Sequence, residues 1–253
     1  MKNQRLIIAL STLIKREVGR FLRIWPQTLL PSSITTTMYF LIFGKLIGCK
    51  LGNMGGVSYI NYIIPGLIMM AVITNSYSNV ASSLFGNKFQ RSIEELLISP
   101  MPSWLILDGF IIGGLLRGLL VGLIVTLVSL LFTKINIVHP FLTIVIVILT
   151  AILFSLAGFI NALLAKKFDD ISIIPIFVLT PLTYLGGVFY NINLLPEFWN
   201  FLSLINPIFY MVNTFRYGIL GVSDLVIGNS LIAIIMFILF LYIVSLILLK
   251  KGI

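Results

Sequence analysis

The segment FLTIVIVILTAILFSLAGFINALLA, residues 141–165, contains no charged residue. A helix of this length rises about 1.5 Å per residue and so spans the ~30 Å hydrocarbon core of a lipid bilayer. Its apolar residues follow one another without the alternation that a lipid-facing barrel strand needs. The segment is therefore predicted to be a membrane-spanning helix.

Similar segments recur along the chain and set the fold class. The predicted crossings are residues 28–47, 60–84, 105–132, 141–165, 171–188 and 229–249. Gly, Pro, Asn and charged residues gather between them, where breaks in a helical bundle are tolerated. The chain is 59% hydrophobic and 10% charged, with a mean hydropathy of +1.11. We predict one all-α integral membrane domain over residues 1–253, with six transmembrane helices.

Lysine and arginine are divided unevenly between the two sides of this bundle. The side that holds both chain ends carries twelve of them and the other side carries four. By the positive-inside rule, this bias places both termini in the cytoplasm. The net charge of +9 is therefore a topology signal, and no nucleic acid partner is expected. The twelve are Lys2, Arg5, Lys15, Arg16, Arg20, Arg23, Lys88, Arg91, Lys166, Lys167, Lys250 and Lys251, and the four are Lys45, Lys50, Lys134 and Arg216.

Residues 1–27 precede the first crossing. Lys2 and Arg5 before an apolar run are also typical of a signal peptide, but no cleavage site of small residues follows. We predict an interfacial helix on the inner leaflet, with its basic face toward the lipid headgroups. The expected apolar stripe is Leu10, Ile14, Val18, Phe21 and Trp25, and the basic face is Arg16, Arg20 and Arg23.

Residues 189–228, between the fifth and sixth crossings, are too apolar for a solvated loop. A seventh crossing is the alternative, but Pro196, the Asn206-Pro207 pair and Arg216 interrupt every window of spanning length. An odd number of crossings would also place the C-terminal lysines outside. Short outer re-entrant helices are expected instead.

Several kinds of chemistry are excluded by what the chain lacks. Cys49 is the only cysteine and His139 the only histidine, so no disulfide, zinc site or cofactor site is expected. No GxxxxGK[ST] loop is present, so the chain is not expected to hydrolyse ATP. Asp108, Glu197 and Asp224 all fall away from the predicted bilayer midplane, where ion-coupled transporters usually carry a carboxylate. Uphill transport then requires energy from another polypeptide.

The stretch NKFQRSIEELLISPMPSW, residues 87–104, is unusually polar for this chain. Read as a helix over 88–99, it has an apolar stripe of Phe89, Ile93, Leu96 and Leu97, with Lys88, Arg91, Glu94 and Glu95 off the stripe. Bases before acids oppose the helix macrodipole. The stretch is either a solvated connector or a docking helix for a cytoplasmic partner.

Three stretches resemble the permeases of ABC-2 type transporters. They are RSIEELLISPMPSW, PIFVLTPLTYLGGVFYNINLLPEFW at 175–199, and INPIFYMVNTFRYGILG at 205–221. The resemblance implies the permease half of an exporter, in which two copies pair and two separate ATPase subunits bind beneath. It also implies that 88–99 is the coupling helix and that 15–25 touches the ATPase. The residues it assigns to ATPase coupling are Lys88, Arg91, Glu94, Glu95, Arg16, Glu17 and Arg20.

Polar residues within the predicted crossings have two interpretations. Interhelical hydrogen bonding is one, and lining of a transport path is the other. The candidates are Ser33, Thr37, Asn75, Ser78, Asn79 and Arg117. Gly114, Gly118 and Gly122 are predicted to pack closely against another helix. Pro175 and Pro181 are expected to bend the fifth crossing, either as a hinge or as a static kink.

The predicted function is that of a permease subunit of an ATP-driven ABC exporter in the bacterial inner membrane, with membrane lipids around it. Its path suits an amphipathic or lipid-like substrate, and the ATPase is a separate subunit. The alternatives are a facilitator or channel without an ATPase and an ion-coupled secondary transporter.

Overall fold

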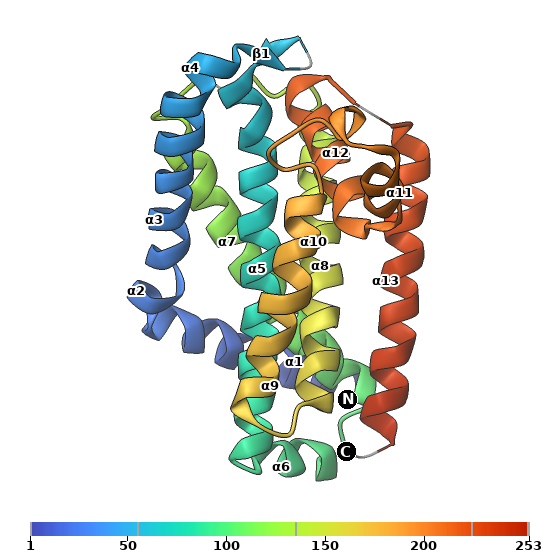
Figure 1. The fold of residues 1–253 in the computed structure, drawn as a ribbon. Helices are drawn as coiled ribbons and strands as arrows, with labels where there is room; N and C mark the ends of the chain where they lie inside the picture. Colours follow the sequence, from blue (N-terminus) through green and yellow to red (C-terminus); the bar gives the residue numbers. More distant parts are fainter. Residues whose placement is uncertain (1, 55, 135, 224, 252–253) are drawn as a thin grey trace.

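The computed structural model describes residues 2–54, 56–134, 136–223 and 225–251. Asp224 lies outside the described residues, as do the side chains of Lys2, Lys45 and Cys49. The described chain is a bundle of long helices with one two-stranded hairpin, which confirms the all-α membrane class (Figure 1).

The elements follow one another in a simple order. The chain begins with α1 (Lys2–Arg23), α2 (Trp25–Thr28), α3 (Leu30–Tyr39), the π-helix η1 (Phe40–Ile47), α4 (Gly48–Leu51), and strands β1 (Asn53–Met54) and β2 (Val57–Ser58). The middle contains α5 (Tyr59–Phe89), α6 (Ser92–Ile98), α7 (Ser103–Ser129) and α8 (Pro140–Leu164). The last part contains α9 (Phe168–Ile174), the π-helix η2 (Pro175–Leu179), α10 (Thr180–Leu185), the 3-10 turn η3 (Ile192–Leu194), α11 (Glu197–Ile205), α12 (Pro207–Leu220) and α13 (Ile227–Lys250).

Five helices among the described residues are long and apolar enough to cross a membrane. They are Tyr59–Phe89, Ser103–Ser129, Pro140–Leu164, Phe168–Leu185 and Ile227–Lys250. These coincide, within a few residues, with five of the six predicted crossings. The remaining prediction, 28–47, falls on the shorter elements α3 and η1, and α4 continues directly from η1. Together these three elements extend about 33 Å at the rise of an α-helix.

Helix α5 is the centre of the bundle and packs against α7, α8 and α12 (Figure 1). Its most apolar window is 83% buried, whereas the corresponding window of α13 is only 11% buried. The predicted glycine ridge of α7 permits the close approach. A Cβ at Gly122 would lie 2.8 Å from Val72 of α5, and one at Gly114 would lie 2.5 Å from Val80. The packing role of these glycines is confirmed.

The two ends of the bundle differ in content. Helix α6 and the C-terminal end of α13 lie at one end, with α1 running across the bundle beside them (Figure 1). The hairpin and the short helices α11 and α12 lie at the opposite end.

On α12, Arg216 is 1% exposed. It donates a hydrogen bond of 2.5 Å to the Gly187 carbonyl and lies 3.9 Å from the Tyr62 ring centroid. Arg216 therefore ties the chain after α10 to α5 and α12.

The predicted apolar stripe of the N-terminal helix is wrong by about one position. The buried residues of α1 are Leu13, Glu17 and Phe21, each four residues apart, while Trp25 is 52% exposed. Glycines of α7 make room for this face, because a Cβ at Gly109 would collide with the Leu13 side chain. Of the predicted stripe only Phe21 is buried, and the acidic residue Glu17 lies on the buried face beside it.

The fifth crossing contains the irregularity expected from its prolines. Pro175 begins the π-helix η2, and Thr180 Oγ1 donates a hydrogen bond of 2.9 Å to the Pro175 carbonyl. A π-turn accommodates backbone groups that proline leaves without their usual partners. Pro181 is the second residue of α10, which continues directly from η2.

Candidate functional site

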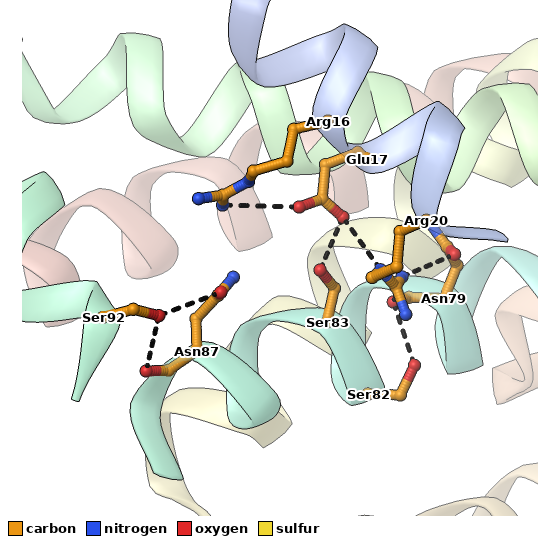
Figure 2. Close-up of polar contacts among 8 residues, drawn as sticks. All are labelled: Arg16, Glu17, Arg20, Asn79, Ser82, Ser83, Asn87 and Ser92. Carbon is orange, nitrogen blue, oxygen red and sulfur yellow. Dashed lines mark hydrogen bonds and ion pairs between the residues drawn. The ribbon is translucent and has the colours of Figure 1, made fainter. Parts of the chain in front are cut away.

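A cluster of polar side chains joins α1 to α5 near the end of the bundle that carries α6 (Figure 2). Glu17 is 1% exposed, and one carboxylate oxygen accepts a hydrogen bond of 2.5 Å from Ser83 Oγ. Arg20 donates to both the backbone and the side-chain oxygen of Asn79, at 2.9 Å and 2.8 Å. The Glu17 carboxylate also lies 3.5 Å from Arg16 and 3.6 Å from Arg20. One buried carboxylate thus pairs with two arginines, of which Arg20 also binds α5.

The electrostatics of this cluster are set by burial. Burial lowers the pKa of the Arg20 guanidinium below its usual value, and the adjacent Glu17 carboxylate opposes that shift. A buried carboxylate is stable only when it is paired and hydrogen-bonded. Glu17 meets this condition through Ser83 and the two arginines. Its side chain therefore faces the bundle interior and α5 rather than the solvent.

A pocket of about 450 Å³ opens beside the cluster. Four of the side chains around it are basic, Glu17 is the only acid among them, and Ser83 and Asn87 of α5 contribute hydrogen-bonding groups. The lining residues are Lys15, Arg16, Glu17, Gly19, Arg20, Arg23, Ile24, Ser83 and Asn87. We call this the basic pocket.

Helix α5 carries two polar stripes that differ in exposure. Asn75, Asn79 and Ser83 are at most 5% exposed and face α1, α3 and α7. Thr74 and Ser82, one position away on the helix, are exposed. Spacing of four residues places each set on one helical face. The buried stripe therefore serves hydrogen bonding between helices, and the exposed stripe lies on the outer surface of this single chain.

Arg117 of α7 is half-buried and contacts the buried stripe of α5. It donates hydrogen bonds to Asn75 Oδ1 at 3.2 Å and to the Thr28 carbonyl at 3.3 Å. Asn75 in turn donates to Ser32 Oγ at 2.8 Å. Arg117 thus links α7 to α5 and, through Asn75, to α3, which is how a cationic side chain is accommodated within a predicted crossing.

Two surface hollows flank the exposed stripe of α5. One, of about 190 Å³, lies between α3 and α5 and is lined in part by Ser32, Thr35, Thr74 and Asn75. The other, of about 320 Å³, lies between α5 and α9 and is lined in part by Ser78, Ser82 and Ser172. We call the surface formed by these two hollows and the stripe between them the polar furrow. Thr74 Oγ1 and Ser82 Oγ donate to carbonyls of α5 itself, at Met70 and Asn79, and apolar side chains line much of the rest of both hollows.

The polar helix after α5 begins later than predicted. Lys88 still belongs to α5, and its ammonium donates to the carbonyls of Leu163 and Ala165, at 2.7 Å and 2.9 Å. It therefore satisfies backbone oxygens at the C-terminus of α8. Arg91 interrupts the helix with a left-handed backbone (φ 60°), and α6 starts at Ser92.

This boundary reverses the expected dipole effect. Glu94 and Glu95 fall in the first turn of α6, where carboxylates interact favourably with the helix N-terminus. The prediction that the charges oppose the macrodipole was wrong, because it assumed one helix running through Arg91.

Helix α6 is anchored on one side and open on the other. Ile93 is 8% exposed and packs in a cluster with residues of α5, α7 and α8. Glu94 and Glu95 are exposed, and Ile98 is 85% exposed. Phe89, at the end of α5, packs edge-on against Phe168 of α9 with ring centroids 4.9 Å apart. The outward surface of α6 therefore combines two carboxylates with an apolar side chain.

The structure separates the predicted site residues into groups. Glu17, Arg16 and Arg20 meet at α5, whereas Arg91, Glu94 and Glu95 lie on or beside α6. Ser33 and Thr37 donate to carbonyls of their own helical run, at Leu29 and Ser33. Asn87 was not among the predicted site residues, although its four-residue spacing from Ser83 was visible in the sequence.

Comparison with known proteins identifies the family. The sequence profile of ABC-2 type transporters matches residues 8–220. The chain is 53% identical to the inner membrane transport permease YadH of Escherichia coli K12, over 97% of this chain and 96% of that protein. The chain belongs to the ABC-2 type transporter family. It is also similar to nodulation protein J of Neorhizobium galegae, with 23% identity over 90% of this chain and 88% of that protein, and to nodulation protein J of Rhizobium leguminosarum bv. viciae, with 21% identity over 73% and 71%.

Membership of the ABC-2 family confirms the resemblance drawn from the three sequence stretches. The chain is a transport permease, and permeases of this family generally pair with an ABC ATPase. The family match covers α1 from residue 8 onward, α6 and the polar furrow, so the site residues described above lie within it.

Proposed function

We propose that this chain is the membrane-spanning permease of an ATP-driven ABC exporter for an amphipathic or lipid-like substrate. Two copies of the chain pair, and two copies of a separate ATPase subunit bind at the end that carries α6. The ATPase supplies the energy, and the paired permeases supply the path.

The observation that carries this proposal is the placement of α6. It is a short helix held to the bundle by Ile93, with Glu94, Glu95 and Ile98 turned outward. Such a surface is suited to a partner with basic and apolar groups. A solvated connector needs no exposed isoleucine beside its carboxylates.

The polar furrow supports the choice of path. In a single chain its hydroxyl groups lie on the bundle surface between α3 and α9. Pairing of two copies through this face encloses both furrows, so their polar groups line a shared space instead of facing lipid. A lining of hydroxyls and amides beside apolar groups suits a substrate with a polar head and an apolar tail.

The membrane arrangement we propose has six crossings, the first formed by α3, η1 and α4. Both termini and α6 face the cytoplasm, and α11 and α12 form re-entrant helices at the outer surface. The excess of Lys and Arg at the α6 end supports this orientation. Similarity to an inner membrane transport permease supports placement in the bacterial inner membrane.

Co-purification tests the proposal directly. The tagged permease, extracted with mild detergent from its native cells, is expected to retain an ATP-binding subunit, and vesicles containing both are expected to hydrolyse ATP in response to substrate. A permease that transports in purified vesicles without any ATPase supports a facilitator instead. Transport driven by an imposed proton or sodium gradient supports an ion-coupled transporter.

A further inference from the structure

We propose that the basic pocket between α1 and α5 binds the phosphate of an anionic lipid headgroup. This inference rests on the proposed function, because it assigns the class of headgroup that the permease receives from the inner leaflet. The site is distinct from the docking surface of α6.

The pocket has the charge that such a ligand requires. Lys15, Arg16, Arg20 and Arg23 face one acid, Glu17, which leaves a net charge of +3 around about 450 Å³. Within the described part of the chain, Lys15 and Arg23 form no ion pair, and both are exposed. Their cationic groups remain available for a ligand.

Two of the basic side chains in the pocket are held in fixed positions by buried partners. Glu17 is 1% exposed and holds Arg16 and Arg20 at 3.5 Å and 3.6 Å, so these two guanidinium groups are positioned by a buried partner. Arg20 is further fixed by its two hydrogen bonds to Asn79. Arginine in a fixed orientation binds phosphate oxygens through parallel hydrogen bonds.

The location matches a headgroup rather than a soluble cofactor. Helix α1 is amphipathic and crosses the end of the bundle, and Trp25 directly after it is 52% exposed, as is common at a membrane interface (Figure 1). Ile24 also lines the pocket. A phosphate in the pocket therefore has apolar surface beside it for an acyl or isoprenoid chain.

The pocket lies at one end of the buried polar stripe of α5. Asn87, Ser83, Asn79 and Asn75 follow one another at intervals of four residues. The first two line the basic pocket, and Asn75 lines the hollow between α3 and α5. Ser83 and Asn79 within this row are buried and bonded to Glu17 and Arg20, so the row fixes the wall of the pocket.

Lipid binding by the full-length permease tests the site without requiring transport. Detergent-solubilised protein is titrated with phosphatidic acid or with phosphatidylcholine, and bound lipid is counted by native mass spectrometry. We expect phosphatidic acid to be retained in preference to phosphatidylcholine. Replacing Lys15→Gln and Arg23→Gln together is expected to raise the dissociation constant for phosphatidic acid on the order of tenfold, because each nearby cation contributes several-fold.

A matched control separates the pocket from general surface charge. Lys250→Gln with Lys251→Gln removes two exposed lysines at the same end of the bundle and is expected to leave the dissociation constant at the wild-type value. The charge-conserving pair Lys15→Arg and Arg23→Lys is expected to restore binding. The proposal would be overturned if the glutamine variants at Lys15 and Arg23 and at Lys250 and Lys251 lost the same affinity for phosphatidic acid. It would also be overturned if the variant at Lys15 and Arg23 lost none.

Two further measurements identify the occupant. Inorganic phosphate or pyrophosphate that displaces phosphatidic acid at equal concentration indicates a free anion as the source, whereas resistance to displacement indicates the lipid. If Lys15→Gln with Arg23→Gln weakens the complex with the ATPase but leaves lipid binding unchanged, the pocket belongs to the ATPase interface and the proposal is wrong. Lipid binding by a permease that retains no ATPase would support the site while refuting the proposed function.

Discussion

Glu17 and Ser83 are joined by a hydrogen bond of 2.5 Å although 66 residues separate them in sequence. The bond fastens the N-terminal helix to the central helix of the bundle. Gly113 of α7 leaves room for the Glu17 side chain at this point, because the Cβ of an alanine at position 113 would lie only 2.8 Å from the Cβ of Glu17. Helix α1 is therefore an integral part of the fold rather than a loosely attached amphipathic segment.

Removing this carboxylate should loosen α1. Glu17→Ala leaves the Ser83 hydroxyl and two arginines without their buried partner, so we expect a loss of about 1–3 kcal/mol in the free energy of unfolding. Glu17→Gln retains a hydrogen-bond acceptor and should lose less. Thermal unfolding in detergent measures both, and an unchanged midpoint for Glu17→Ala would contradict the assigned role.

Lys88 should act in stability rather than in docking. Lys88→Met removes the donor to the Leu163 and Ala165 carbonyls, and we expect a loss of about 1–2 kcal/mol in the free energy of unfolding. The affinity for the ATPase subunit should stay at the wild-type value. A variant that folds as well as wild type but fails to bind the ATPase would reverse this assignment.

Charge reversal on α6 should affect ATPase binding rather than the stability of the fold. Glu94→Lys with Glu95→Lys is expected to weaken the complex with the ATPase or to uncouple ATP hydrolysis from transport. Loss of a favourable dipole interaction in the first turn costs the fold only about 0.3–1 kcal/mol per residue. Pull-down of the ATPase and the thermal midpoint of the permease measure the two effects.

The control for this pair is Asp169→Lys, which reverses an exposed acid in the first turn of α9 at the same end of the bundle. It should leave ATPase binding intact. If the α6 pair transports normally with its ATPase, or fails only because it does not fold, the docking role of α6 is wrong.

The left-handed backbone at Arg91 should respond to glycine. A non-glycine residue in this conformation costs about 1 kcal/mol, which glycine avoids. Arg91→Gly is therefore expected to raise the thermal midpoint relative to Arg91→Ala, which has the same backbone cost as arginine. Equal midpoints for the two variants would show that the backbone at this position is not strained.

Reporter fusions test the membrane arrangement. Six crossings with a cytoplasmic N-terminus place alternate loops on opposite sides of the membrane. The expected order is outside, inside, outside, inside, outside, inside at Gly52, Asn87, Asn136, Lys167, Asn193 and Ile253. A cytoplasmic signal at Asn193 would rule out this arrangement.

The sequence predicted the long helices well because their signal depends on hydrocarbon thickness alone. Residues 141–165 differ from α8 by one residue at each end. The first crossing was less regular than predicted, since no pattern of hydropathy distinguishes a π-turn from an α-turn in an apolar run.

The candidate site was harder to predict because charge has no fixed meaning in a membrane protein. Glu17 and Glu94 look alike in sequence, yet one is buried against Ser83 and the other is exposed on α6. The difference in burial comes from tertiary packing. Gly109 and Gly113, nearly a hundred residues from Glu17, provide the space beside α1. The break at Arg91 was also invisible, because its left-handed backbone is uncommon for arginine.

Helix α5 has 31 residues and therefore extends about 46 Å, well beyond the ~30 Å hydrocarbon core. Pro65 lies near the Tyr59 end of this helix, opposite α6, and the remainder continues without proline to Phe89, where α6 follows after two residues. A helix this long behaves as a lever with its pivot in the packed middle of the bundle. Tilting it by about 5° moves each end by about 2 Å in opposite directions. We expect a push on α6 toward the bundle axis to move the Tyr59 end away from it, so that the two mouths of the proposed path along α5 cannot widen together.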